Sequence, residues 1–238
     1  MFDSFVSLSD RTVYTLAENR PYGIDLVQAL DVPDVTDPMN IKKVCIIDSG
    51  YDLQHVDLPK GAEVTGDGDL CSSGDCRWDE DDNGHGTHVA GTVAAIGGNG
   101  KGVVGVNHHN SISLHIVRVF GASGGASSSS IIAAMNKCRE NGANIISMSL
   151  GYSTKSFNPP QAFSKAVDTI TDNGILVVAA AGNDGNGNYG WPASIEKGMS
   201  VASVRSDSKR SSFSQYNDAI DITAPGSFVL STFPDDEY

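Results

Sequence analysis

Val44-Cys45-Ile46-Ile47-Asp48-Ser49-Gly50 is the stretch of sequence that decides the fold. Four apolar residues, three of them β-branched, run directly into a turn that begins with a carboxylate. A run this short, rich in β-branched residues and followed by Asp, Ser and Gly, is typical of a buried strand that ends in a turn. The sequence therefore predicts a strand at residues 44–47 that carries Asp48 at its carboxyl end.

The same pattern of a short apolar run before a glycine recurs along the chain, at residues 114–120, 145–150 and 175–181. Between these runs, apolar residues spaced at i, i+3 or i+4, and i+7 predict helices near residues 89–96, 131–138 and 163–170. Strands that alternate with helices favour an α/β fold, with a mostly parallel central sheet and helices on both faces. The nearly unbroken apolar character of each strand agrees, because such strands are buried on both sides.

Composition excludes several classes of function. The chain has 238 residues, of which 39% are apolar and 19% charged, as is typical of a globular protein. Its 16 Lys and Arg against 29 Asp and Glu give a net charge of −13, whereas nucleic-acid binding needs clustered basic residues. No apolar stretch approaches the roughly 20 residues of a membrane span. Residues 1–16 lack the continuous apolar core of a signal peptide. We therefore expect neither nucleic acid nor a membrane as a partner.

Polar clusters follow the predicted strands, at the edge where ligands of open α/β sheets bind. Asp48 by itself is typical of a turn, and His85 lies between two glycines at the start of a predicted helix. A carboxylate that orients an imidazole is, however, the recurring general-base pair of nucleophilic catalysis. Asn183, after a third strand, offers a side-chain amide that could stabilise an oxyanion. The sequence thus places an acid, a base and an oxyanion donor at one edge.

Four segments of the chain resemble the subtilisin family of serine proteases, in that family's order. They are residues 44–50 (VCIIDSG), 85–92 (HGTHVAGT), 147–151 (SMSLG) and 179–183 (AAAGN). Residues 212–214 (SFS) and 224–226 (APG) are similar to the segment before the family's nucleophile. The resemblance runs from about residue 21 to the end. It implies a subtilisin-like catalytic domain at residues 21–238, with residues 1–20 a propeptide tail or linker.

The resemblance also implies a role for each matching residue. Asp48 would orient the imidazole, His85 would act as general base and then acid, and Asn183 would bind the oxyanion. Ser149-Leu150-Gly151 would pair with an extended substrate backbone, as in other cases of strand addition. The implied protein is a monomeric serine endopeptidase that acts on polypeptides without a catalytic cofactor. By resemblance it is secreted or extracytoplasmic.

The family's nucleophile is the one part without a match. It lies in a Gly-Thr-Ser-Met-Ala motif, and the sequence reaches Tyr238 without that motif. We therefore expect an incomplete catalytic domain, inactive by itself, whose serine lies beyond residue 238. Two alternatives stay open: an inactive relative that binds peptides or regulates a partner, and a metal-dependent hydrolase that uses His85 and His88. No further ligands at zinc spacing are evident for the second.

Asp57 and the glycine-rich loop at residues 96–102, which includes Asn99, resemble a structural calcium site of the family. Carboxylate, amide and carbonyl oxygens are the ligands that calcium prefers. The acidic run at residues 79–82 is interpreted as solvated surface, in preference to a selector for basic substrates.

The four cysteines fall into two groups. Cys71 and Cys76 flank a short loop and could close a small disulfide in a secreted protein. Cys45 lies in the first predicted strand and Cys138 on an apolar helix stripe, so we predict that both are core thiols.

Overall fold

The computed structural model describes residues 18–33, 35, 37, 40–71, 76–109 and 111–238. These residues form one 3₁₀-helix, four α-helices and nine strands. In chain order they are α1 (Tyr22–Leu26), η1 (Ala29–Asp31), β1 (Lys42–Asp48), β2 (Val64–Asp67), α2 (His85–Ala94), β3 (Ile112–Arg118), α3 (Ser128–Glu140), β4 (Ile145–Met148), β5 (Tyr152–Thr154), α4 (Gln161–Asp172), β6 (Leu176–Ala180), β7 (Tyr189–Trp191), β8 (Met199–Val204) and β9 (Ile222–Pro225).

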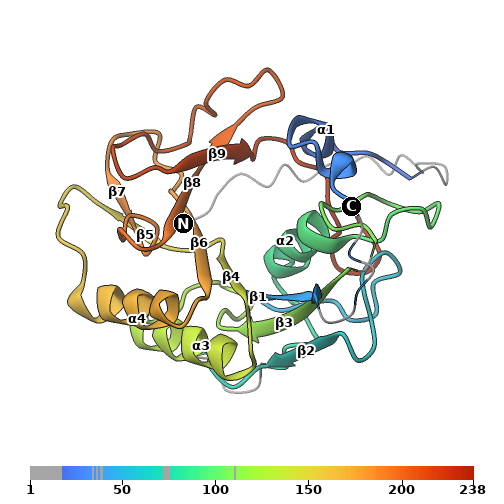
Figure 1. The fold of residues 1–238 in the computed structure, drawn as a ribbon, viewed down its shortest axis with the longest axis horizontal. Helices are drawn as coiled ribbons and strands as arrows, with labels where there is room; N and C mark the ends of the chain where they lie inside the picture. The colour runs from blue at the N-terminus through green and yellow to red at the C-terminus, as the bar shows by residue number, and fades with distance from the viewer. Residues whose placement is uncertain (1–17, 34, 36, 38–39, 72–75, 110) are drawn as a thin grey trace.

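Seven strands form the central sheet, in the order β2-β3-β1-β4-β6-β8-β9 (Figure 1). Each pair of neighbours in this sheet runs parallel. The carboxyl ends of its strands therefore meet at one edge, which is where the loops after β1, β4 and β6 begin. The short strands β5 and β7 pair antiparallel in a separate sheet, just beyond the end of β4.

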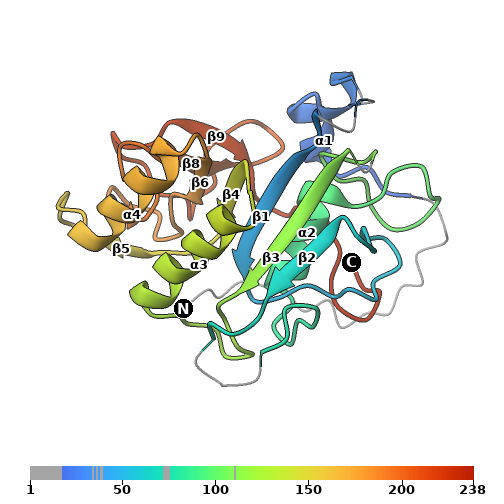
Figure 2. The same ribbon diagram turned by 60° about the horizontal axis from the view of Figure 1, so that its bottom comes forward.

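Alternate residues of β1 face the two sides of the sheet. Val44 and Ile46 pack in one core with Ala90 of α2. Cys45 and Ile47 belong to a second core, which contains the buried sides of α3 and α4. Figure 2 shows α3 and α4 on one face of the sheet and α2 on the other. The predicted α/β fold, with a mostly parallel sheet and helices on both faces, is confirmed.

The prediction that Cys45 and Cys138 are core thiols is wrong, because the two are joined in a disulfide. Both residues are fully buried, and their Cα atoms lie 5.7 Å apart where α3 packs on β1. The strand and helix patterns were each interpreted correctly, but the contact between them depends on the tertiary fold. Cys71 and Cys76 form the short disulfide that their spacing allows.

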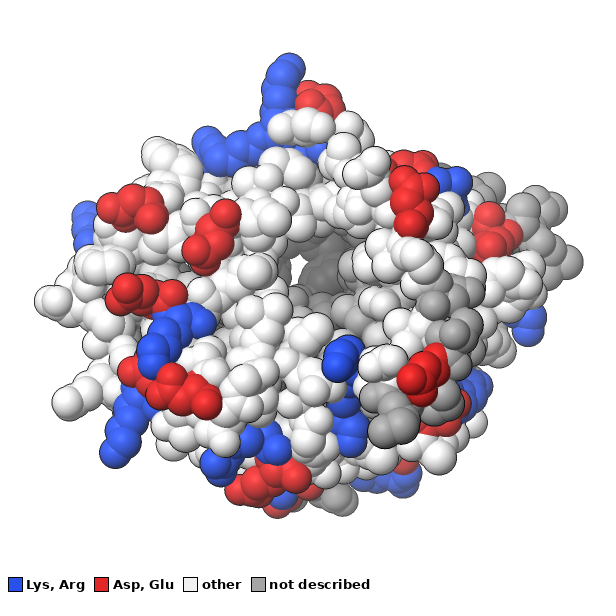
Figure 3. Space-filling view, viewed as in Figure 1, with Lys and Arg blue, Asp and Glu red and all other residues white. Residues whose placement is uncertain are grey.

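Figure 3 shows a hollow near the centre of one face, with uncharged residues along much of its rim. None of the helices in the described part of the chain combines the length and apolar character needed to cross a bilayer. Of the segment predicted to be a propeptide tail or linker, only residues 18–20 belong to the described part. There the Asn19 amide donates to the carbonyl of Gly102 at 2.7 Å.

Candidate active site

The carboxyl end of β1 and the first residue of α2 meet through their side chains. Asp48, the last residue of β1, is fully buried, and His85, the first residue of α2, is partly exposed. The Nδ1 atom of His85 lies 2.7 Å from Oδ1 of Asp48. Because a carboxylate only accepts hydrogen bonds, the hydrogen lies on Nδ1, and Nε2 of the neutral ring carries a lone pair. This is the geometry of an oriented general base.

A close approach of two backbones makes this contact possible. The first turn of α2 packs directly on the residues that follow β1, and a Cβ atom at Gly86 would collide with the carbonyl oxygen of Gly50. The absence of a side chain at Gly86 therefore lets α2 start against the end of β1. The amide of Gly86 donates to the Ser49 hydroxyl at 2.9 Å and fixes the same junction.

The surroundings of His85 favour its charged form. Burial lowers the pKa of His85, but the hydrogen bond to Asp48 and the charges of Asp48 and Asp81 raise it by more. The pKa therefore lies above the ordinary value of 6.5. A base that is charged after it takes up a proton is stabilised in this environment.

His88, one turn further along α2, binds a different partner. Its Nε2 atom lies 3.1 Å from the carbonyl oxygen of Val229, and burial lowers its pKa. His85 is bound to Asp48 by its Nδ1 atom, so the two rings do not share a ligand. Among the residues that the structure describes, no group of three or more His, Cys, Asp or Glu could hold a metal ion. These contacts do not favour the zinc-hydrolase alternative.

The other predicted site residues lie in loops at the same edge of the sheet. Asn183 is exposed in the loop that follows β6, and Ser149-Leu150-Gly151 follows β4. Leu150 is buried in the core shared with α3 and α4, and this packing holds the segment in place. Since β1, β4 and β6 are parallel, these loops leave the sheet on the side where Asp48 lies.

Gln215 was not anticipated from the sequence. This fully buried residue donates its backbone amide to the Gly182 carbonyl at 3.2 Å. Its Nε2 atom donates to the carbonyl of Asn188 at 2.8 Å and to the Ser153 hydroxyl at 3.4 Å. It thus connects the loop of Asn183 to the segment after Gly151. A single sequence gives no signal for such a role, because the contacts join three distant segments.

The interpretation of residues 79–82 as solvated surface is wrong for Asp81. This side chain is only 7% exposed, because Arg118 holds the acidic loop against the protein. The buried guanidinium of Arg118 donates to the carbonyl of Glu80 at 2.9 Å and to Oδ2 of Asp82 at 2.9 Å. Asp82 itself is exposed. A run of four acidic residues gives no sign that one of them points inward.

Asp57 and Asn99, the predicted calcium ligands, lie side by side. Nδ2 of Asn99 donates to Oδ1 of Asp57 at 2.6 Å, and the Val103 amide donates to Oδ2 at 2.8 Å. Burial raises the pKa of Asp57 by more than these bonds lower it, and the nearby carboxylate of Glu18 adds to the rise. A buried carboxylate next to a second carboxylate fits the hard oxygen chemistry of calcium. Asn99 would have to turn its amide by half a turn to present oxygen.

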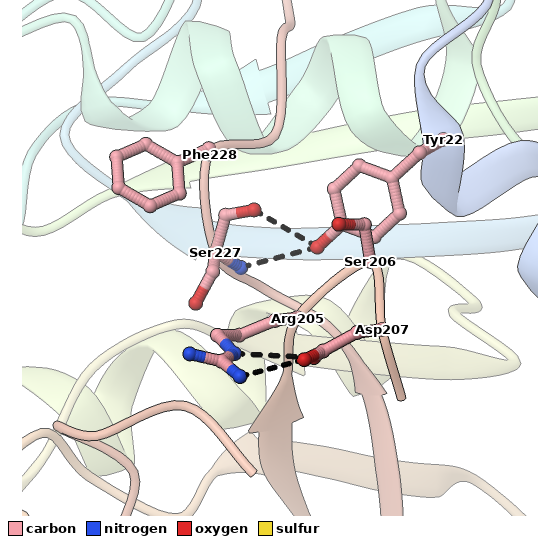
Figure 4. Close-up of a pocket in the computed structure, with 6 residues that line it drawn as sticks. All are labelled: Tyr22, Arg205, Ser206, Asp207, Ser227 and Phe228. Carbon is pink, nitrogen blue, oxygen red and sulfur yellow. Dashed lines mark hydrogen bonds and ion pairs between the residues drawn. The ribbon is translucent and has the colours of Figure 1, made fainter. Parts of the chain in front are cut away.

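A separate cavity of about 390 Å³ opens beside α1 (Figure 4). The Tyr22 hydroxyl donates there to the carbonyl of Ser227 at 2.9 Å, and Arg205 and Asp207 form an ion pair. Phe228 lies at its edge and is 93% exposed. The cavity contains neither Asp48 nor His85, and its two charges neutralise each other.

The chain is similar to known proteins in sequence and in structure. The profile of the Subtilase family matches residues 41–236. The alkaline protease of Shouchella clausii is 39% identical over 230 residues, which are 96% of this chain and 57% of that protein. Subtilisin Savinase of Lederbergia lenta is 39% identical over 223 residues, which are 93% of this chain and 77% of that protein.

A solved structure is similar as well. The psychrophilic subtilisin-like protease Apa1 of the Antarctic psychrotroph Pseudoalteromonas sp. AS-11 is 42% identical, with a TM-score of 0.80. The match covers 91% of this chain and 48% of that one, so this chain spans about half the length of Apa1. The family profile, the relatives and the fold all agree, and the chain belongs to the subtilase family of serine proteases.

Proposed function

We propose that this chain provides the acid–base and substrate-binding parts of a serine endopeptidase, with Asp48, His85 and Asn183 as catalytic residues. The observation that supports the proposal most is the 2.7 Å contact between Asp48 and His85 at the carboxyl end of β1. The substrates would be polypeptides, in line with the family.

The geometry supports a definite path for the proton. Nε2 of His85 takes the proton of a serine hydroxyl as the oxygen attacks the peptide carbonyl. The imidazolium is stabilised by Asp48 and then gives the proton to the departing amine. An acyl-enzyme remains, which water hydrolyses with His85 again acting as base. Asn183 donates from its side-chain amide to the oxyanion in both halves of the reaction.

Ser149-Leu150-Gly151 would hold the substrate. A Cβ atom at Gly151 would crowd the carbonyl oxygen of Trp191, so the absence of a side chain there lets the two segments approach closely. An extended substrate backbone that pairs with residues 149–151 would lie along the edge that carries Asp48 and Asn183. Main-chain pairing of this kind gives affinity with little dependence on the substrate's side chains.

The nucleophile is proposed to lie in polypeptide beyond residue 238, because no serine of this sequence stands in a Gly-Thr-Ser-Met-Ala motif. The test is labelling with a fluorophosphonate probe. We expect no labelling of the 238-residue chain, and stoichiometric labelling of the longer gene product that is lost in a His85→Ala variant. Stoichiometric labelling of the 238-residue chain would refute the placement of the nucleophile. A longer product that is folded yet never labelled would favour an inactive, peptide-binding relative.

Calcium is proposed as a structural ion bound by Asp57, Asn99 and loop carbonyls, where it would neutralise the buried carboxylate. No catalytic cofactor is needed for the steps above. We also propose that the protein is monomeric and acts in a secreted or extracytoplasmic setting. The two disulfides support that setting, because disulfides persist in oxidising compartments.

A further inference from the structure

We infer that Asp81 is a positioning residue for the Asp48–His85 pair, an inference that rests on the function proposed above. Asp81 lies in the acidic loop just before α2, at the junction of that helix with the end of β1. Its carboxylate binds Ser49, Gly84 and Thr87, and it would position His85 through them. Its role would be to hold the two elements that carry the pair.

Both oxygens of the Asp81 carboxylate bind the start of α2. Oδ2 accepts hydrogen bonds from the amide of Thr87 at 2.8 Å and from its hydroxyl at 2.7 Å. Oδ1 accepts a third from the amide of Gly84 at 2.9 Å. The first amides of a helix have no partner within the helix, and the N-cap residue Gly84 has no side chain that could bind them. Asp81 therefore caps α2 from outside the helix, where a negative charge is favourable.

The same carboxylate also binds the end of β1. Oδ1 accepts a hydrogen bond from the Ser49 hydroxyl at 2.8 Å, and that hydroxyl in turn accepts one from the Gly86 amide. The backbone amide of Ser49 donates to Oδ1 of Asp48 at 2.8 Å, the same oxygen that binds His85. Ser49 thus connects Asp81, which its hydroxyl binds, with Asp48 and His85, which meet at the oxygen that its backbone amide binds.

The negative charge of Asp81 also acts on His85. Among the described residues, the charges of Asp48 and Asp81 raise the pKa of His85, and the charge of His85 in turn lowers that of His88. Asp81 is buried, so its charge is less screened than that of an exposed neighbour. Arg118, through the carbonyl of Glu80, keeps the loop in place. Loss of Asp81 should therefore loosen the pair and also remove a charge that favours protonated His85.

The test is an NMR titration of the His85 ring, which needs no nucleophile and is independent of the labelling experiment. The variants are Asp81→Asn and Ser49→Ala, with Glu80→Gln as a matched control that removes an exposed charge from the same loop. We expect the pKa of His85 to fall by about 0.5 or more in both test variants and by less than about 0.2 in the control. A His85→Gln variant assigns the signal among the six histidines.

Ser49→Ala keeps the test decisive if Asp81→Asn does not fold. It deletes the hydroxyl that links both Asp81 and the Gly86 amide to the end of β1, and it leaves the three bonds from Asp81 to the start of α2 intact. An unchanged His85 pKa in folded Ser49→Ala, equal to that of Glu80→Gln, would overturn the inference. Failure of fluorophosphonate labelling in the longer product would instead count against the proposed function and leave this result standing.

Discussion

Cys45 and Cys138 are joined by a disulfide that ties β1 to α3, three residues before Asp48. The strand that carries the proposed catalytic carboxylate is thus held covalently as well as by packing. The linked residues are 93 positions apart, whereas Cys71 and Cys76 are only 5 apart. A cross-link that closes a longer loop removes more conformational freedom from the unfolded chain.

Loss of the long-range disulfide should therefore cost more stability than loss of the short one. Replacing Cys45 and Cys138 by Ala should lower the free energy of unfolding by about 3–5 kcal/mol, and replacing Cys71 and Cys76 by Ser by about 2 kcal/mol. Urea unfolding of both double variants measures the difference. Equal losses would contradict the assignment of Cys45–Cys138 as the main covalent constraint.

Asp48→Asn should abolish most activity of the longer gene product that we propose to carry the nucleophile, and it should leave the fold intact. The amide cannot both accept from Nδ1 of His85 and stabilise its positive charge, so the ring loses its oriented tautomer. We expect kcat to fall about 10⁴-fold, the loss known for the same change in a serine protease of another fold. Steady-state kinetics gives the value, and circular dichroism checks the fold. A loss below about tenfold would argue against Asp48 as the orienting residue.

His85 should also make stability depend on pH. Its pKa in the folded chain is raised above 6.5, so its protonated form is favoured by folding. The resulting stabilisation is complete below the pKa of the unfolded chain, about 6.5, and is lost as the pH rises through the folded value. The free energy of unfolding of the wild type, relative to His85→Gln, should therefore decrease across this range. Urea unfolding of both proteins between about pH 5 and pH 9 measures it, and a constant difference would contradict the shift.

The sheet was predictable as far as its strands are buried, apolar and β-branched. The apolar runs at residues 44–47 and 145–150 predict β1 and β4. The strand β8 gives no such run, because it alternates buried and half-buried residues and includes the buried polar Ser200. The three-residue strands β5 and β7 are too short to leave a pattern. Their pairing depends on the fold that surrounds them.

The residues of the site likewise divide into those that the sequence predicts and those that only the folded structure identifies. Asp48, His85 and Asn183 stand in contiguous motifs, so the sequence alone singles them out. Asp81 and Gln215 act through contacts with segments distant in the chain, and their types are ordinary for an acidic loop and a turn. The acidic run is held by Arg118, which binds the Glu80 carbonyl and Asp82 and lies 36 residues after Asp82 in the chain. The roles of Asp81 and Gln215 can therefore be identified only from the packed structure.

Calcium should raise the melting temperature through Asp57. At a free concentration of about 100 times Kd, a bound ion adds about 2.7 kcal/mol, which corresponds to about 5–10 °C for a chain of this size. We expect this rise on adding calcium to chelator-treated protein, and its absence in Asp57→Asn. Asp207→Asn, an exposed carboxylate beside α1, is the matched control and should keep the response. A calcium response that survives in Asp57→Asn would place the ion elsewhere.

Gly182→Ala should disturb the loop of Asn183 through a collision with Gln215. Gly182 has a φ of 115°, a conformation that strains any other residue, and its Cβ atom would overlap the buried Oε1 of Gln215. Gly124→Ala is the matched control, since Gly124 also has a positive φ but open space around the new atom. Backbone strain costs about 1–3 kcal/mol at such positions, and it is greater at the φ of 115° of Gly182 than at the φ of 70° of Gly124, so the excess loss at Gly182 combines extra strain with the collision. Restoring stability in a Gly182→Ala/Gln215→Ala double variant would trace the excess to this contact, whereas equal losses at Gly182 and Gly124 would show that Gln215 simply moves aside.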